Sequence, residues 1–234
     1  MVDNLQTDAA GGVAAVDRAL SIVAALEASS LPISLSDLSR QTDLYKSTIL
    51  RLIVSLEKAG YVVRTSDGRY GIGPMAWRLG LAYERSNPLK THIMPVLRKL
   101  VQSGTESASF HIRQNAQSRL CLFRVDSMHS TLDRVQAGQV LPLRGAAGRI
   151  LQIFEAETVT SEKERIAISY GERDPSCAGI ASPVFGADGR LQGALSLSGP
   201  LDRFTGEAVA FMRVQILEAA AIITLSLGGA AAKN

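Results

Sequence analysis

In residues 43–72 a predicted helix begins with polar and cationic residues, and a predicted hairpin follows it directly. Within that helix the apolar residues recur at the i, i+3, i+4, i+7 spacing of a single buried face, formed by Ile49, Leu52, Ile53 and Leu56. Two short alternating runs follow at 61–64 and 69–72, with Ser66-Asp67-Gly68 between them, which is a hairpin signal. A helix of this kind followed by a basic hairpin is typical of a winged helix-turn-helix.

The preceding residues complete that module. Residues 13–29 carry apolar side chains at helical spacing, and Leu31-Pro32 ends the pattern. Ser34, with Asp37 three positions later, then forms a capping-box pattern that opens a second short helix. We therefore expect a flexible tail over 1–12 and a winged helix-turn-helix domain over 13–73.

In a helix-turn-helix the second helix of the pair enters the major groove of DNA, so its first turn must be polar. Lysine and arginine neutralise phosphates, arginine also pairs with guanine, and hydroxyl groups donate to phosphate or base. Residues 40–78 carry seven cations against three anions, while residues 1–87 are balanced. The candidate DNA contacts on the helices and on the wing are Ser36, Tyr45, Lys46, Ser47, Thr48, Arg51, Arg64 and Arg69. A protein-interaction module with an ordinary solvated face is the alternative.

The remaining chain predicts a second domain of the α+β class. Residues 74–105 read as a helical linker, with breaks at Asn87-Pro88 and Pro95. Beyond them lies a domain over 106–234 that alternates strands and helices. Its expected strands are 107–114, 119–127, 131–136 and 139–144, with a hairpin over 179–200 and helices over 145–157 and 205–227. The last helix is expected to bury Phe211, Val214, Leu217, Ala221 and Leu225.

Composition excludes several classes of protein. With 234 residues, 46% apolar and 20% charged, the chain can bury a substantial core. Cys121 and Cys177 are too few for a disulfide scaffold, and neither has histidines at metal-ligand spacing, so we expect buried thiols and no metal or cofactor. No catalytic motif is present, which argues against an enzyme. The acidic N-terminus and the short uncharged runs predict neither a signal peptide nor a membrane span, hence a cytoplasmic protein.

The motifs together resemble one family. The segments AVDRALSIVAALEAS, ISLSDLSRQTDL, YKSTILRLIVSLEKAGYV and DGRYGIGP, followed by VLPLRGAAGRIL and GERDPSCAGIASPVFGADGRLQGALSLSGP, are similar to the IclR-type bacterial transcriptional regulators. The resemblance covers nearly the whole chain after residue 13. It implies a winged-helix domain, a helical linker and a GAF- or profilin-like effector-binding domain with an antiparallel sheet. It also implies homodimers or homotetramers that bind palindromic operator DNA.

The resemblance further implies an effector pocket for a small organic acid, either a carboxylate or an aromatic catabolite. Residues carried over to that pocket are Gly145, Ala146, Ala147, Asp174, Cys177, Ser196 and Ser198, with Leu141 and Leu143 as an apolar wall. This chain departs from the family in three places, one of which is the Arg-Ile-Leu-Gln that follows Gly148 where Lys-Ala-Leu-Leu is usual. Asp43-Leu44-Tyr45 stands where Gly-Leu-Pro is usual, and the segment between Phe154 and Ile166 is shorter.

The predicted function is therefore a sequence-specific DNA-binding regulator, expected to repress a catabolic operon under control of the effector. The alternative is an effector-independent DNA-binding or protein-interaction module whose ligand domain has degenerated.

Overall fold

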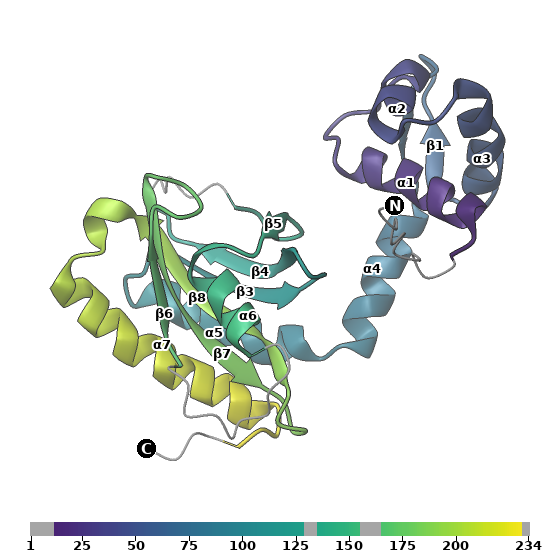
Figure 1. Cartoon of the computed structure of the whole chain (residues 1–234). Coiled ribbons are helices and arrows are strands. Elements are labelled where there is room, and N and C mark those ends of the chain that lie inside the picture. Colours follow the sequence, from purple (N-terminus) through teal and green to yellow (C-terminus); the bar gives the residue numbers. More distant parts are fainter. Residues whose placement is uncertain (1–11, 129–134, 155–164, 231–234) are drawn as a thin grey trace, which may run out of the picture. The chain divides into compact units, whose positions relative to one another are not determined.

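The computed structural model describes residues 12–128, 135–154 and 165–230, which divide into two compact units, residues 1–86 and 87–234 (Figure 1). The expected linker over 74–105 is shared between the units, because its first helix belongs to the first unit and its second helix to the second. Each unit is described by itself.

The first unit is a winged helix-turn-helix. Its elements in chain order are α1 (Ala14–Glu27), α2 (Leu35–Thr42), α3 (Lys46–Lys58), β1 (Val62–Arg64), β2 (Tyr70–Ile72) and α4 (Met75–Ser86). The strands pair antiparallel, and Ile33 adds a bridge to Tyr70. The core is made by one face each of α1, α2 and α3 and by the hairpin, and it buries Ile22, Leu26, Leu38, Ile49, Ile53, Leu56, Val62 and Tyr70.

Local interactions explain where these elements begin and turn. Ser34 accepts a hydrogen bond from the Asp37 backbone N–H at 3.2 Å and donates to the Asp37 carboxylate at 2.7 Å, which confirms the predicted capping box. That hydroxyl also lowers the pKa of Asp37 below its usual value. Asp43 ends α2 with φ 55°, a left-handed conformation that glycine adopts more easily. Gly73 lies so close to the Gly60 carbonyl that a Cβ would be 2.2 Å from its oxygen, which leaves no room for a side chain.

The second unit is built on one six-stranded antiparallel sheet in the order β5-β4-β3-β8-β7-β6. The sheet has helices on both of its faces, and a short 3₁₀ turn η1 (Leu201–Arg203) precedes the last helix (Figure 1). The strands are β3 (Ser107–Arg113), β4 (Ser118–Asp126), β5 (Val140–Pro142), β6 (Ala167–Tyr170), β7 (Cys177–Phe185) and β8 (Leu191–Pro200). The helices are α5 (Leu89–Gln102), α6 (Gly145–Ile153) and α7 (Gly206–Ser226).

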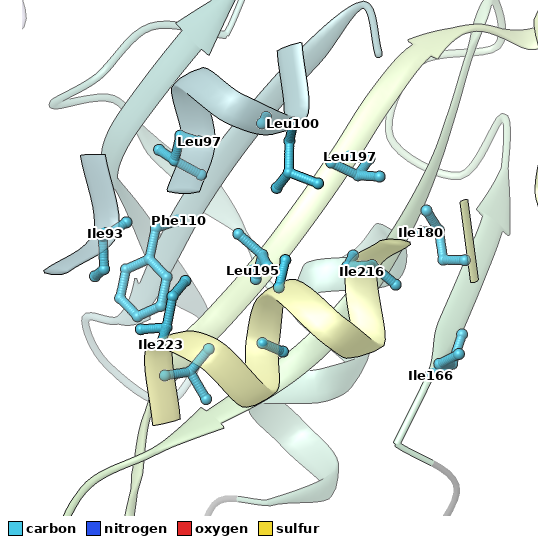
Figure 2. Close-up of a cluster of buried hydrophobic side chains, with 14 of the residues drawn as sticks. Ile93, Leu97, Leu100, Phe110, Ile166, Ile180, Leu195, Leu197, Ile216 and Ile223 are labelled. Carbon is cyan, nitrogen blue, oxygen red and sulfur yellow. The ribbon is translucent and has the colours of Figure 1, made fainter. Parts of the chain in front are cut away.

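The pleat of the sheet separates two environments. Even-numbered β3 residues such as Phe110 and odd-numbered β8 residues such as Leu195 face α5 and α7 and form the main core with them (Figure 2). Ile93 and Leu97 of α5 and Ile216 of α7 are fully buried in this cluster. On the opposite face α6 packs over β6, β7 and β8 in a second cluster that contains Ala146, Ile150, Phe154, Ala181 and Phe185.

Several sequence predictions need correction. The face of α7 that was expected to be buried is exposed at Phe211, Val214, Leu217 and Leu225, while Ile216, Ala220 and Ile223 are buried. Because large apolar residues lie on both the buried and the exposed side of α7, periodicity does not distinguish its two faces. The strand β6 was not predicted. The expected strand over 131–136 falls mostly outside the described residues, and the shortened segment 155–164 falls wholly outside them.

Among the described residues α7 is also the helix that is long and apolar enough to span a membrane by length and composition. A core helix meets the same criterion. Here one side of α7 packs on the sheet through Val209, Ile216 and Ile223, and Arg213 and Glu218 lie on its exposed side. The packing against the sheet accounts for part of its apolar composition.

Candidate nucleic-acid interface and ligand pocket

The start of α3 presents an exposed polar surface. Tyr45 is the N-cap residue and is 85% exposed, and Lys46, Ser47 and Arg51 are exposed beside it. Ile49 and Ile53 are buried on the other side of the same helix. No side chain caps α3, so the first backbone N–H groups of the helix point outward beside these residues. An uncapped helix start flanked by cations is a favourable place for a phosphate.

The other predicted DNA contacts lie on α2 and on the wing. Ser36 is exposed in the first turn of α2, and Thr48 is half-buried on α3. Arg64 on β1 lies over the Tyr70 ring, with its guanidinium carbon 5.7 Å from the ring centroid, and Arg69 forms a 3.3 Å ion pair with Asp67 at the hairpin turn. A hydrogen bond from Thr65 is the main reason that the pKa of Asp67 lies below its usual value. The structure thus places these residues on the surface of one small unit.

The second unit contains a pocket between the start of α6 and the sheet. Seven of the nine residues predicted for an effector site line it: Gly145, Ala146, Ala147, Asp174, Cys177, Ser196 and Ser198. The two leucines of the expected apolar wall do not. Leu141 packs with Cys121 and Val135, and Leu143 packs under α6, because their strand and turn direct both side chains into neighbouring apolar clusters.

Glycines allow α6 to approach so closely. Gly145 opens the helix with φ 74°, a left-handed conformation. A Cβ on Gly148 would lie 2.5 Å from the Leu143 carbonyl carbon, so only glycine fits there. The Ala146 N–H donates to the Ser169 hydroxyl on β6 at 2.9 Å, and the N-cap residue Arg144 makes no side-chain cap of its own. The positive end of α6 therefore faces the pocket.

Three buried polar side chains lie at the sheet side of the pocket. Ser109, His111 and Arg119 are 2%, 3% and 4% exposed. The Ser109 hydroxyl lies 2.9 Å from His111 Nε2, and Arg119 Nη1 lies 2.8 Å from His111 Nδ1. Arg119 also donates from Nε to the Pro142 carbonyl at 3.2 Å. These contacts hold the three side chains in one chain of hydrogen bonds.

The electrostatics of the pocket favour an anion. Burial, followed by the positive charges of Arg119, Arg124 and Arg173, lowers the pKa of His111 well below its usual value, so the imidazole is neutral. Those three arginines line the pocket together with Glu172 and Asp174. Glu172 forms an ion pair with Arg149, and Arg124 forms one with Asp126 at 2.7 Å; neither Arg149 nor Asp126 lines the pocket. The lining therefore carries more positive than negative charge.

Sequence reasoning missed the cationic half of this pocket. Ser107, Ser109 and His111 alternate with Ala108 and Phe110, and this alternation of polar and apolar residues was the available signal for a polar sheet face. No pattern of neighbouring residues predicts that Arg119 and Arg124 lie on the same face of the sheet as these residues. Their position depends on a bulge between Phe110 and His111 in the pairing of β3 with β4. Among the described residues no group of three or more His, Cys, Asp or Glu side chains is placed to hold a metal.

Comparison with known proteins finds two matching family models. Residues 15–66 match the IclR helix-turn-helix domain, and residues 154–225 match the model described as bacterial transcriptional regulator IclR C-terminal. Among curated proteins the chain is similar to the HTH-type transcriptional regulator BhcR of Paracoccus denitrificans, with 28% identity covering 98% of this chain and 92% of the relative. It is also similar to the acetate operon repressor of Salmonella typhimurium, with 24% identity covering 94% and 92%.

Solved structures have the same fold. A putative IclR transcriptional regulator from Silicibacter sp. TM1040 matches with a TM-score of 0.77 and 25% identity, covering 93% of this chain and 98% of that one. An IclR homologue from Microbacterium hydrocarbonoxydans, complexed with 4-hydroxybenzoate, matches with a TM-score of 0.75 and 19% identity, covering 91% and 98%. The winged helix-turn-helix followed by an antiparallel sheet with helices was the predicted fold class, and these matches confirm it.

Proposed function

Because the chain belongs to the IclR family of bacterial transcriptional regulators, we propose that a small organic acid bound in its second unit controls how tightly its first unit binds operator DNA. The family models and relatives are transcriptional regulators, which confirms that the chain is not an enzyme. We further propose that it acts in the cytoplasm as a repressor, as the name of the acetate operon repressor describes for that relative.

For DNA we propose that α3 enters the major groove. The observation that supports this is the exposed, uncapped start of α3 with Lys46, Ser47 and Arg51 around it. In this arrangement Lys46 and the helix N–H groups bind phosphate, while Arg51, one turn further along, reaches a base edge. Arg64 and Arg69 on the wing, with Ser36 and Tyr45 beside α3, contact the flanking backbone.

For the effector we propose a small carboxylate rather than an aromatic acid. The space open to water-sized groups in the pocket is about 40 Å³. One water needs about 10 to 15 Å³ on this scale, so the pocket accepts about three or four such groups, which is close to the four non-hydrogen atoms of acetate. The homologue that holds 4-hydroxybenzoate supports an organic acid as the class of ligand. An aromatic ring would require this pocket to open.

We also propose that the protein is a homodimer whose contact is made by α4. No residue of α4 is buried within its own unit, and Trp77, Leu79 and Tyr83 are 72%, 49% and 44% exposed. A dimer would cover this apolar face and would match the two-fold symmetry of a palindromic operator. Helix α5 is less suited to this contact, because Leu97 and Leu100 are buried in the core of the second unit.

The control step we propose is a shift in population. Only Asn87 and Pro88 separate α4 from α5, and α5 packs directly on the sheet that carries the pocket. Effector binding would favour one arrangement of the two DNA-binding units of a dimer, and with it one fit to the operator.

The test is a fluorescence anisotropy titration with duplex DNA from upstream of the protein's own coding region, compared with a scrambled duplex at two salt concentrations. A preference for the upstream duplex that persists at the higher salt supports sequence-specific regulation. The titration is then repeated with acetate, glyoxylate, pyruvate and 4-hydroxybenzoate. Operator affinity that changes with none of these acids would contradict control by a small organic acid and would favour the effector-independent alternative.

A further inference from the structure

The hydrogen-bond chain at the sheet side of the pocket has a defined direction. Arginine carries only donors, so the 2.8 Å contact between Arg119 Nη1 and His111 Nδ1 requires Nδ1 to be the acceptor. A neutral imidazole carries one proton, which must then sit on Nε2. Nε2 lies 2.9 Å from the Ser109 oxygen, so the imidazole donates to that hydroxyl. Arg119 thereby determines which tautomer His111 adopts.

The direction of the chain determines what Ser109 offers to a ligand. Its oxygen already accepts from His111, and its own proton has no acceptor among the residues that the structure describes. Ser109 lines the pocket, between Arg124 on one neighbouring strand and Ser196 on the other. The hydroxyl proton is therefore available to a group inside the pocket.

We propose that Ser109 is a hydrogen-bond donor to the effector, held in that role by His111 and Arg119 as positioning residues, so that the pocket selects an ionised carboxylate over the corresponding amide. A carboxylate presents acceptors to every donor around it, while an amide turns one N–H₂ group toward the Ser109 proton or toward the guanidinium of Arg124. This inference rests on the proposed effector site, and it adds which ligand group the site recognises and which residues enforce the choice.

The experiment is isothermal titration calorimetry on the full-length protein with matched probes: acetate and acetamide, glycolate and glycolamide, pyruvate and pyruvamide. The wild-type protein should bind at least one carboxylate at least about tenfold more tightly than its amide. Ser109→Ala should weaken that carboxylate about 10- to 100-fold, the change expected when one hydrogen bond to a charged group is lost, and should reduce the carboxylate-to-amide ratio.

Two variants of His111 separate positioning from packing. In His111→Gln the side-chain oxygen can accept from Arg119 while the N–H₂ group donates to Ser109, so carboxylate selectivity should be largely kept. In His111→Leu both contacts are lost, and selectivity should fall as in Ser109→Ala. The matched control is Ser182→Ala, because Ser182 is 2% exposed like Ser109 but pairs with Leu195 on the opposite face of the sheet. Thermal unfolding of each variant checks its fold, and Ser109→Cys replaces Ser109→Ala if the latter does not fold.

The outcomes distinguish this inference from the proposed function. If carboxylates bind the wild-type protein but Ser109→Ala keeps both their affinity and the carboxylate-to-amide ratio, the role of Ser109 is wrong and the effector site stands. Equal selectivity in His111→Leu and His111→Gln would remove the positioning role. If no probe binds the wild-type protein, both the inference and the small-carboxylate effector are overturned.

Discussion

The buried neutral imidazole of His111 predicts a specific dependence of stability on pH. Burial and three nearby arginines lower its pKa in the folded protein well below the ordinary value of 6.5. The unfolded chain regains the ordinary value, so it takes up a proton at a higher pH than the folded protein does. Stability from this group is fully present above pH 6.5 and is lost as the pH falls from 6.5 toward the folded-state pKa.

The size of this loss of stability follows from the difference in bound protons between the unfolded and the folded state. Between those two pKa values the unfolded state holds about one more proton, which corresponds to about 1.4 kcal/mol per pH unit. From pH 7.5 to 5.5 the unfolded imidazole changes from about 10% to about 90% protonated. The free energy of unfolding should then fall by about 1.4 kcal/mol because of His111 alone.

The assay is urea denaturation of the wild-type protein and of His111→Gln at pH 5.5, 6.5 and 7.5, followed by circular dichroism. Glutamine does not titrate, so the difference between the two proteins removes the contribution of His92, His129 and the carboxylates. The wild-type protein should lose about 1.4 kcal/mol more than the variant between pH 7.5 and 5.5. Parallel pH profiles for the two proteins would refute a depressed pKa, and with it the neutral His111 tautomer on which the role of Ser109 depends.

Three further predictions concern the other parts of the molecule. Arg51→Ala should weaken operator binding about 10- to 100-fold in the anisotropy titration. The control Lys58→Ala, at the far end of the same helix, should change operator affinity little. Equal effects of the two substitutions would count against α3 as the helix that reads the bases. Gly148→Ala should lower the free energy of unfolding in urea by about 1 to 3 kcal/mol, because the added Cβ would lie 2.5 Å from the Leu143 backbone. Gly206→Ala is the control, since a Cβ at that position meets open space. Trp77→Glu should shift the protein toward monomers in sedimentation equilibrium, and an unchanged mass would show that the subunits meet elsewhere.

The first unit was largely predictable from sequence because its signals are local. The apolar spacing of Ile49, Ile53 and Leu56, the Ser34 cap and the Asp67-Gly68 turn each involve residues a few positions apart. The left-handed conformation of Asp43 also follows from the position that it occupies between two helices. Local chemistry therefore determines most of this unit.

The pocket was only partly predictable because it is built from distant strands. Ser109 and Arg124 become neighbours through the pairing of β3 with β4, and Ser196 joins them from a strand nearly ninety positions later. The resemblance supplied the pocket residues near α6 and β8, but it did not extend to the polar side chains of β3 and β4. The exposed side of α7 was misassigned for a different reason, since a helix with large apolar residues on both sides gives no clear periodic signal.

The alternation along β3 has a consequence for how such a protein can change over evolutionary time. Ala108 and Phe110 belong to the core, while Ser109 and His111 belong to the pocket, although all four are consecutive in the chain. Substitutions on the pocket side can therefore change the lining of the pocket without disturbing the packing on the core side of the same strand. The sheet can in this way keep its architecture while the chemistry of the pocket changes by small steps.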